Sequence, residues 1–210
     1  MPASRPSGGD PAGPFARAAA RLVVRTTGWR VQGHLPDAPK CVVIAAPHTS
    51  NWDLLYMLAV AWTLGVRPAW LGKRELFRWP LGPVLRRLGG IPVDRGRRSN
   101  LVQQVADHIA SVERCFLVIP PSGTRGRAAH WKSGFYHVAR TAGVPIVCAF
   151  LDYRRKLGGL GLLFRPSGDV RADMCAVRGF YGTITARHPA SVTPVRLVEE
   201  DATPPAVAEG

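Results

Sequence analysis

The chain has 210 residues, of which 46% are apolar, 28 are Lys or Arg and only 14 are Asp or Glu. This length and apolar content predict one globular domain and argue against overall disorder. The formal net charge of +14 predicts a polyanionic partner, which could be nucleic acid, anionic lipid or a phosphorylated substrate. The longest run without a charged residue, 54–66, is shorter than the ~20 residues that span a bilayer. We therefore expect a soluble or peripheral protein.

Apolar runs that suit buried strands alternate along the chain with segments whose apolar residues have helical spacing. Strands are expected at 29–35, 41–46, 68–72, 91–95, 115–119, 145–153 and 157–164. Helices are expected at 14–26, 51–64, 83–88, 99–112, 133–141 and 171–186. This alternation predicts a single α/β domain with a largely parallel, mixed sheet flanked by helices. We expect the domain to cover 14–190, between a disordered N-terminus at 1–13 and a loose C-terminal tail at 191–210.

Local composition adds three expectations. Pro92 predicts that its strand lies at an edge of the sheet or that the proline stands near the start of the strand, because proline has no N–H to donate to a neighbouring strand. The first thirteen residues lack the apolar core of a secretory signal. The four cysteines are far apart, and three of them lie in predicted buried strands, so we expect reduced core residues in a cytosolic protein and no metal site. They are Cys41, Cys115, Cys148 and Cys175.

The expected helix at 14–26 carries a basic stripe. Arg17, Arg21 and Arg25 recur every four residues and so share one side of that helix. A basic amphipathic helix is typical of elements that lie on a membrane surface. An ordinary N-terminal helix that packs on the domain is an equally good interpretation.

A histidine stands where a predicted strand ends, and a carboxylate stands in the first turn of the next predicted helix. They are His48 and Asp53, in the stretch HTSNWD. Ligands of α/β folds bind at the carboxyl ends of the strands. A histidine there can act as a general base if a carboxylate orients its ring. The alternative is a helix cap, because Ser50 and Asp53 have the spacing of a capping box.

Two arginines also follow predicted strands. Arg95 ends the stretch GIPVDR, and Arg125 ends the stretch SGTR, in which Gly123 allows a close backbone approach to a ligand. Guanidinium groups from two strand ends can clamp a phosphate. The alternatives are that Arg95 pairs with Asp94 or another carboxylate and that Arg125 is a solvated loop charge. The excess of basic over acidic residues favours an anionic ligand.

Residues 67–98 contain nine basic and two acidic residues, with Trp70, Phe77 and Trp79 interleaved among them. Aromatic side chains beside cations suit a membrane interface. They also suit single-stranded nucleic acid, whose bases stack on aromatic rings. We favour a membrane, because no RNA-binding, zinc-finger or helix-turn-helix signature accompanies them. A plain solvated face is the third possibility.

Taken in order, four segments resemble the four sequence blocks of the glycerolipid acyltransferases of the lysophosphatidic acid (1-acylglycerol-3-phosphate) type. The segments are His48-x4-Asp53, GIPVDR at 90–95, SGTR at 122–125 and VPIV at 144–147. The HTSNWD stretch and WKSGFY at 131–136 are most similar to the short bacterial members. The resemblance covers about residues 28–188 and implies a mixed α/β fold that works at a membrane surface.

The resemblance implies that an acyl group moves from acyl-CoA or acyl carrier protein to a hydroxyl of a lysophospholipid or related lipid. It implies no cofactor and no covalent acyl-enzyme. His48 would be the general base and Asp53 its orienting partner. The other site residues it implies are Arg95, Gly123, Thr124 and Arg125 for the acceptor's phosphate, and Lys73 and Pro145 on the acyl-donor side. The expected partners are an anionic membrane surface, the lysolipid and the thioester, but not nucleic acid, and the expected location is the cytoplasm, on the inner face of the cell membrane.

One residue departs from the family pattern. Ser122 stands where the third block of the family has a glutamate. A carboxylate is therefore lost beside Arg125, which could alter the acceptor or weaken activity. A basic lipid-binding protein of the same fold is the first alternative to an enzyme, and a nucleic-acid-binding module is the second. We favour an acyltransferase, because His48 and Asp53 are both present.

Overall fold

The computed structural model describes residues 12–94 and 98–201. Seven strands form one sheet, and each lies within or close to an expected strand segment. They are β1 (Arg30–Gln32), β2 (Lys40–Ala45), β3 (Ala69–Lys73), β4 (Gly90–Val93), β5 (Cys115–Ile119), β6 (Ile146–Asp152) and β7 (Leu157–Phe164). Their order across the sheet is β1-β7-β6-β2-β5-β3-β4. The continuous apolar runs become the central strands β2, β5 and β6, because these are covered on both faces.

Neighbouring strands pair in parallel, except for β6 and β7, which are antiparallel. This confirms the predicted single α/β domain with a largely parallel, mixed sheet. Strand β4, which contains Pro92, lies at an edge of the sheet as predicted. The parallel register aligns the carboxyl ends of β2, β5, β3 and β4, so the loops that follow these strands leave from one side of the sheet.

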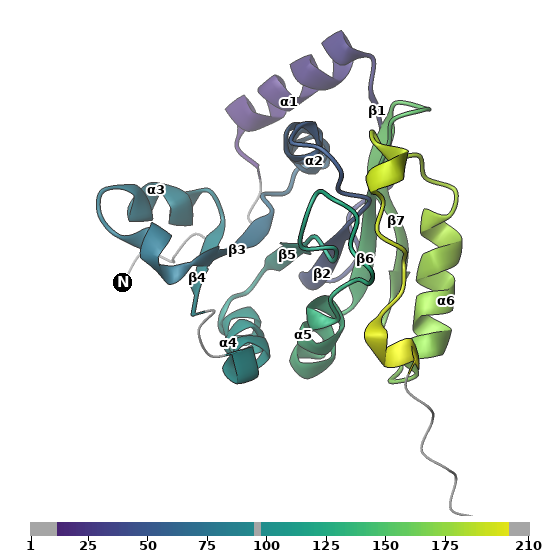
Figure 1. Cartoon of the computed structure of the whole chain (residues 1–210). Coiled ribbons are helices and arrows are strands. Elements are labelled where there is room, and N and C mark those ends of the chain that lie inside the picture. The colour runs from purple at the N-terminus through teal and green to yellow at the C-terminus, as the bar shows by residue number, and fades with distance from the viewer. Residues whose placement is uncertain (1–11, 95–97, 202–210) are drawn as a thin grey trace, which may run out of the picture.

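Helices lie on both faces of the sheet (Figure 1). They are α1 (Pro14–Thr27), α2 (Trp52–Thr63), α3 (Leu81–Arg87), α4 (Arg98–Ser111), α5 (Gly134–Ala142) and α6 (Val170–Tyr181), with short 3-10 helices η1 (Arg74–Phe77), η2 (Pro189–Ser191) and η3 (Val198–Asp201). The last long helix was expected to reach residue 186 but ends at Tyr181. After Gly182 the chain turns back to β6, where the Tyr153 N–H donates to the Thr185 carbonyl at 2.9 Å.

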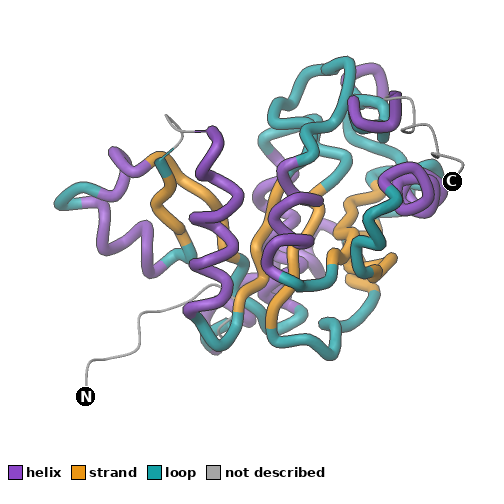
Figure 2. Tube along the Cα trace, turned by 90° about the horizontal axis from the view of Figure 1, so that it is seen from below, coloured by secondary structure: helices purple, strands orange, loops and turns teal. Residues whose placement is uncertain are grey.

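Two groups of helices cover the two faces. Helices α4, α5 and α6 share one apolar core with the strands, built around Leu117, Phe135 and Met174. Helix α2 covers the other face, where Val60 packs with Trp29 and Leu151, and α1 lies on its outer side (Figure 1). Both views place α3 at one end of the molecule and α6 at the other (Figure 1, Figure 2). None of the described helices has the length and apolar character needed to cross a membrane.

Contacts with the folded chain extend beyond the expected domain limits, 14 and 190. Ala12 is buried, and its N–H donates to the Gly65 carbonyl at 2.9 Å. At the other end, Leu197 is fully buried and forms a β-bridge with Trp131. The polar and proline-rich residues around Leu197 led to the expectation of a loose tail, but buried Leu197 and the Arg178–Glu200 ion pair hold this segment against the core. The expectations for residues 1–11 and 202–210 lie outside the described residues.

Candidate active site

His48 and Asp53 lie together at the carboxyl end of the central strand β2, in the loop that leads into α2. His48 Nδ1 lies 3.2 Å from Asp53 Oδ2. The Asp53 side chain is 1% exposed and the His48 side chain 25% exposed. The predicted contact between the two residues is therefore present. The imidazole keeps a path to solvent, while its partner is buried.

Asp53 also makes one half of the predicted capping box with Ser50, although the N-cap of α2 is Asn51, which has no side-chain cap. Asp53 Oδ2 accepts the backbone N–H groups of Thr49 at 2.7 Å and Ser50 at 2.9 Å. The reciprocal half of a capping box is absent at this helix start, because the Ser50 hydroxyl accepts from the Trp52 N–H at 3.2 Å instead. One carboxylate oxygen thus fixes both the loop backbone and the imidazole.

The protonation of the pair follows from these contacts. Burial would raise the pKa of Asp53, but hydrogen bonds from His48, Tyr153 and the N–H groups of Ser50 and Thr49 outweigh burial and lower that pKa below its ordinary value. An ionised carboxylate only accepts hydrogen bonds, so the hydrogen bond assigns the proton of the neutral imidazole to Nδ1. Nε2 is then the nitrogen that can accept a proton from a substrate.

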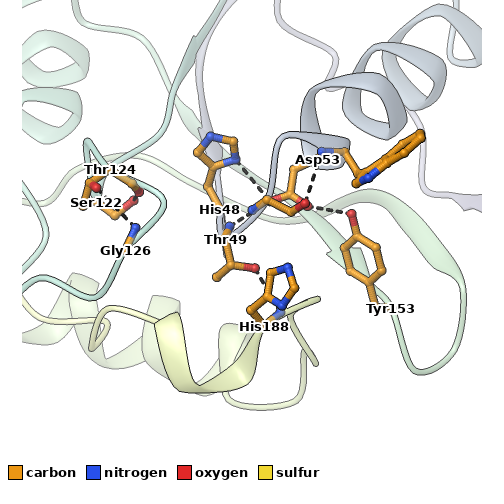
Figure 3. A network of polar contacts seen from close by, with 10 residues as sticks. His48, Thr49, Asp53, Ser122, Thr124, Gly126, Tyr153 and His188 are labelled. Atoms are coloured by element: carbon orange, nitrogen blue, oxygen red, sulfur yellow. Dashed lines mark hydrogen bonds and ion pairs between the residues drawn. The ribbon is translucent and has the colours of Figure 1, made fainter.

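Tyr153 is a site residue that the sequence analysis missed. It follows β6, the neighbour of β2, and its hydroxyl donates to Asp53 Oδ1 at 2.6 Å. Its ring packs edge-on against Trp29, with ring centres 5.1 Å apart, and against Tyr56 at 6.1 Å. Burial, together with the bond to Asp53, raises the pKa of the Tyr153 hydroxyl, which keeps it a donor. Figure 3 shows His48 and Tyr153 approaching Asp53 from opposite sides.

The segment after α6 supports the same site from a distant part of the sequence. The Arg187 guanidinium lies 5.7 Å from the ring centres of both Trp52 and Tyr153. The His188 N–H donates to the Thr49 hydroxyl at 3.2 Å (Figure 3). Sequence reasoning missed these two residues because it placed Arg187 next to the end of a predicted helix.

The SGTR loop follows β5, which pairs directly with β2, and therefore leaves the same side of the sheet as His48. Ser122 is buried, and its hydroxyl donates to the Thr124 carbonyl at 2.7 Å. The Thr124 hydroxyl in turn accepts the Gly126 N–H at 3.2 Å (Figure 3). The residue that departs from the family pattern thus closes a turn within the loop. Arg125 is exposed and forms no ion pair within the described chain.

Gly123 is required for the shape of this loop. Its φ angle of +64° is in the left-handed region, and an added Cβ would lie 2.8 Å from Lys132 Nζ. The Lys132 backbone N–H also donates to the Pro121 carbonyl at 2.8 Å. Lys132 therefore adds a second cation to the SGTR loop. It lies in the WKSGFY stretch, which the sequence analysis noted but did not assign to the site.

The remaining predicted residues are only partly brought together. Lys73 is the last residue of β3, is exposed, and lies on the same side of the sheet as the His48 loop. Pro145 is buried just before β6, and its carbonyl accepts the Val42 N–H at 3.0 Å. This places Pro145 at the end of the parallel strands opposite His48, and its assignment to the acyl-donor side stays a prediction. Arg95 lies outside the described residues.

Residues 29–151 match the family model of the Acyltransferase family. The 1-acyl-sn-glycerol-3-phosphate acyltransferase of Haemophilus influenzae is 28% identical over 130 residues, which cover 57% of this chain and 52% of that protein. The chain thus spans about half the length of this curated relative. The crystal structure of the 1-acyl-sn-glycerophosphate (LPA) acyltransferase PlsC from Thermotoga maritima has a similar fold, with a TM-score of 0.53, 16% identity and coverage of 82% of this chain and 80% of that chain.

A partly exposed histidine lies against a buried aspartate at the carboxyl end of a central parallel strand, a place where α/β folds bind ligands. The family model covers more than half of the chain and includes both residues. The chain belongs to the Acyltransferase family, and the family resemblance drawn from the sequence blocks is confirmed.

Proposed function

We propose that the protein transfers a fatty acyl group from an acyl thioester to a hydroxyl of a lysophospholipid or a related lipid. The observation that carries this proposal is the His48–Asp53 pair, whose geometry leaves Nε2 free to accept a proton. The family assignment and the relative from Haemophilus influenzae support acyl transfer to a glycerolipid. The thioester would be acyl-CoA or acyl carrier protein.

In the proposed reaction His48 is the general base. Its Nε2 takes the proton of the acceptor hydroxyl while that oxygen attacks the thioester carbonyl carbon. The tetrahedral intermediate then collapses, the carbon–sulfur bond breaks, and the leaving sulfur takes the proton from Nε2. The products are an ester and a free thiol, and the histidine returns to its starting state. Asp53 holds Nδ1–H throughout and stabilises the imidazolium while it exists.

The SGTR loop is the proposed site for the acceptor's phosphate. Arg125 and Lys132 are cations of this loop that have no carboxylate partner within residues 12–94 and 98–201. Arg95 is proposed to join them, and Lys73 to contact the donor at the end of β3. The proposed place of work is the cytoplasmic, inner face of the cell membrane. The net charge of +14 and the three buried, unpaired cysteine thiols support that location.

The test is an incubation of the full chain with labelled acyl-CoA and a panel of lysolipids that includes lysophosphatidic acid. We expect a new diacyl lipid and an equal amount of free thiol. His48→Ala should lower the rate by about 100- to 10,000-fold, the range of general-base catalysis. His34→Ala is the matched control, because His34 is exposed and lies in the loop between β1 and β2. Substantial turnover by His48→Ala would refute the mechanism.

Ser122 favours a second candidate, a lipid-binding protein with little catalysis, because the family's glutamate is missing from the loop. That candidate predicts vesicle binding that weakens with salt and no turnover on any acceptor. A nucleic-acid-binding module would instead retain RNA or DNA in preference to anionic vesicles at physiological salt.

A further inference from the structure

One short segment holds a concentration of exposed apolar side chains. Among the described residues, twelve large apolar side chains are exposed, and five of them lie within residues 76–88. Their exposed fractions range from 53% to 87%, the highest being that of Trp79. The five are Leu76, Trp79, Leu81, Val84 and Leu88. We call residues 74–88, which contain η1 and α3, the η1–α3 segment.

The same segment is strongly cationic. It contains four arginines and a single acidic residue, Glu75. None of the four forms an ion pair with a residue in the described ranges. They are Arg74, Arg78, Arg86 and Arg87. The segment thus presents apolar surface and uncompensated positive charge together.

This surface is held in place by a buried anchor. Phe77 is buried against β3 and β4, where any Cβ added at Gly72 or Gly90 would lie within 2.7 Å of its ring. The Arg86 guanidinium lies 5.5 Å from the centre of the Phe77 ring. The Gly82 N–H donates to the Arg78 carbonyl at 2.7 Å and joins the start of α3 to η1. The segment that carries the exposed side chains is therefore fixed to the sheet.

We propose that the η1–α3 segment docks on an anionic lipid bilayer, an inference that rests on the proposed function. A bilayer accepts both parts of the surface at once. Apolar side chains enter the acyl region, a tryptophan lies at the level of the head groups, and arginines reach lipid phosphates. A nucleic acid would pair with the arginines and stack on Trp79, but Leu81, Val84 and Leu88 would stay in water.

The position of the segment suits acyl transfer to a lipid. It begins directly after Lys73, at the carboxyl end of β3, and β3 is separated from β2 by β5 alone. With strands about 4.8 Å apart, the start of the segment lies roughly 10 Å across the sheet from β2. Docking there would bring lipid head groups to the side of the sheet where His48 lies. Both views show α3 at an outer end of the molecule (Figure 1, Figure 2).

Helix α1 offers a competing surface and hence a matched control. Phe15 and Leu22 are exposed on it, and Arg21 and Arg25 are exposed beside them. The sequence analysis considered this helix as a membrane element. Its opposite side packs on α2 (Figure 1). The η1–α3 segment differs from α1 by its larger number of exposed apolar residues and by Trp79.

The experiment measures binding of the full chain to vesicles by co-sedimentation at physiological salt. Vesicles contain either phosphatidylcholine alone or equal parts of phosphatidylcholine and phosphatidylglycerol. Each arginine near an anionic surface contributes about fivefold, so Arg74→Gln with Arg78→Gln should weaken binding to the anionic vesicles about 25-fold. The α1 pair, Arg21→Gln with Arg25→Gln, should change binding less than about twofold if α1 stays away from the lipid.

An apolar pair tests the other half of the surface. Trp79→Ser with Leu81→Ser should weaken binding to both kinds of vesicle, whereas Phe15→Ser with Leu22→Ser should not. Thermal unfolding checks that all variants are folded, which is expected because the changed side chains are exposed. Loss of binding in the α1 variants alone, equal binding to neutral and anionic vesicles, or a preference for RNA over vesicles would each overturn the proposal.

Activity separates this inference from the proposed function. The Arg74/Arg78 variant should acylate a short-chain lysolipid that is monomeric in solution at the wild-type rate, yet lose activity on vesicle-bound lysolipid. If the wild type binds vesicles through the η1–α3 segment but acylates neither substrate, the docking surface is supported and the proposed function fails. If the variant loses activity on both substrates equally, the segment does not act through docking and the inference fails.

Discussion

The hydroxyl of Tyr153 is expected to position the His48–Asp53 pair of the proposed reaction, and Tyr153→Phe tests this. Asp53 Oδ2 takes three hydrogen bonds, from His48, Thr49 and Ser50. Oδ1 takes its bond from Tyr153 at 2.6 Å. Phenylalanine keeps the ring that packs on Trp29 and removes only the donor.

The size of the effect follows from the burial of Asp53, whose side chain is 1% exposed. A hydrogen bond to a buried charged group contributes about 1.5–3 kcal/mol. Without the Tyr153 hydroxyl, Asp53 Oδ1 must find another donor or bind water. Either change moves the carboxylate and weakens the hydrogen bond between Oδ2 and His48 Nδ1. Because a tenfold rate change corresponds to about 1.4 kcal/mol, we expect kcat to fall roughly 10- to 100-fold. The acceptor KM should change less than about twofold, since Tyr153 approaches Asp53 from the side opposite His48 (Figure 3).

The assay is the initial rate of thiol release from acyl-CoA at several acceptor concentrations, with urea unfolding in parallel. Tyr136→Phe is the matched control, because the Tyr136 hydroxyl also donates to a carboxylate, Asp173, at 2.7 Å. Both variants should lose a similar amount of stability, but only Tyr153→Phe should lose kcat. A wild-type kcat in Tyr153→Phe, or an equal loss of kcat in Tyr136→Phe, would refute the positioning role.

Three further outcomes are expected. The pKa of Asp53 is lowered in the folded state. Its contribution to stability is therefore fully present above the ordinary carboxyl pKa of about 3.9, and it is lost as the pH falls through the folded-state pKa. The difference in unfolding free energy between wild type and Asp53→Asn should therefore be larger at pH 7 than at pH 3, and a difference independent of pH would contradict this. Gly123→Ala should cost about 1–2 kcal/mol and raise the acceptor KM, whereas Gly168→Ala, at φ +99° with open space around its Cβ, should cost stability alone. Leu197→Ala should cost about 2–5 kcal/mol in thermal unfolding, unlike its exposed neighbour Val198→Ala; equal melting temperatures would show that the C-terminal segment does not stabilise the core.

The predictable parts of the fold and the site were those governed by local sequence. The central strands were found because strands buried on both faces must be apolar throughout. Pro92 marked an edge strand because proline lacks the N–H that a second neighbour would need. His48 and Asp53 were found because one turn joins them, so their spacing in the sequence already implies proximity in space.

The missed parts depend on contacts between distant segments. Tyr153 bonds Asp53 across a sequence separation of 100, and His188 bonds Thr49 across 139. No local period or spacing encodes such pairs. The block around Pro145 has a related limit, since a sequence block indicates that a residue belongs to a strand but not which end of that strand it occupies. The last helix ends before residue 186 because the Thr185 carbonyl accepts the Tyr153 N–H, a long-range backbone bond that competes with the helical pattern.

The C-terminal segment has a consequence for how the protein is made. His188 holds the His48 loop, Thr193 accepts the Ala128 N–H at 3.0 Å, and Leu197 pairs with Trp131. A ribosome adding 5–20 residues per second needs about 7–30 s to pass from His48 to Leu197. Until then the nascent chain lacks the segment that contacts Thr49, Ala128 and Trp131. The site is therefore completed only after Leu197 has been made, and a chain that stops before His188 should form the strands but lack the contact that holds the His48 loop.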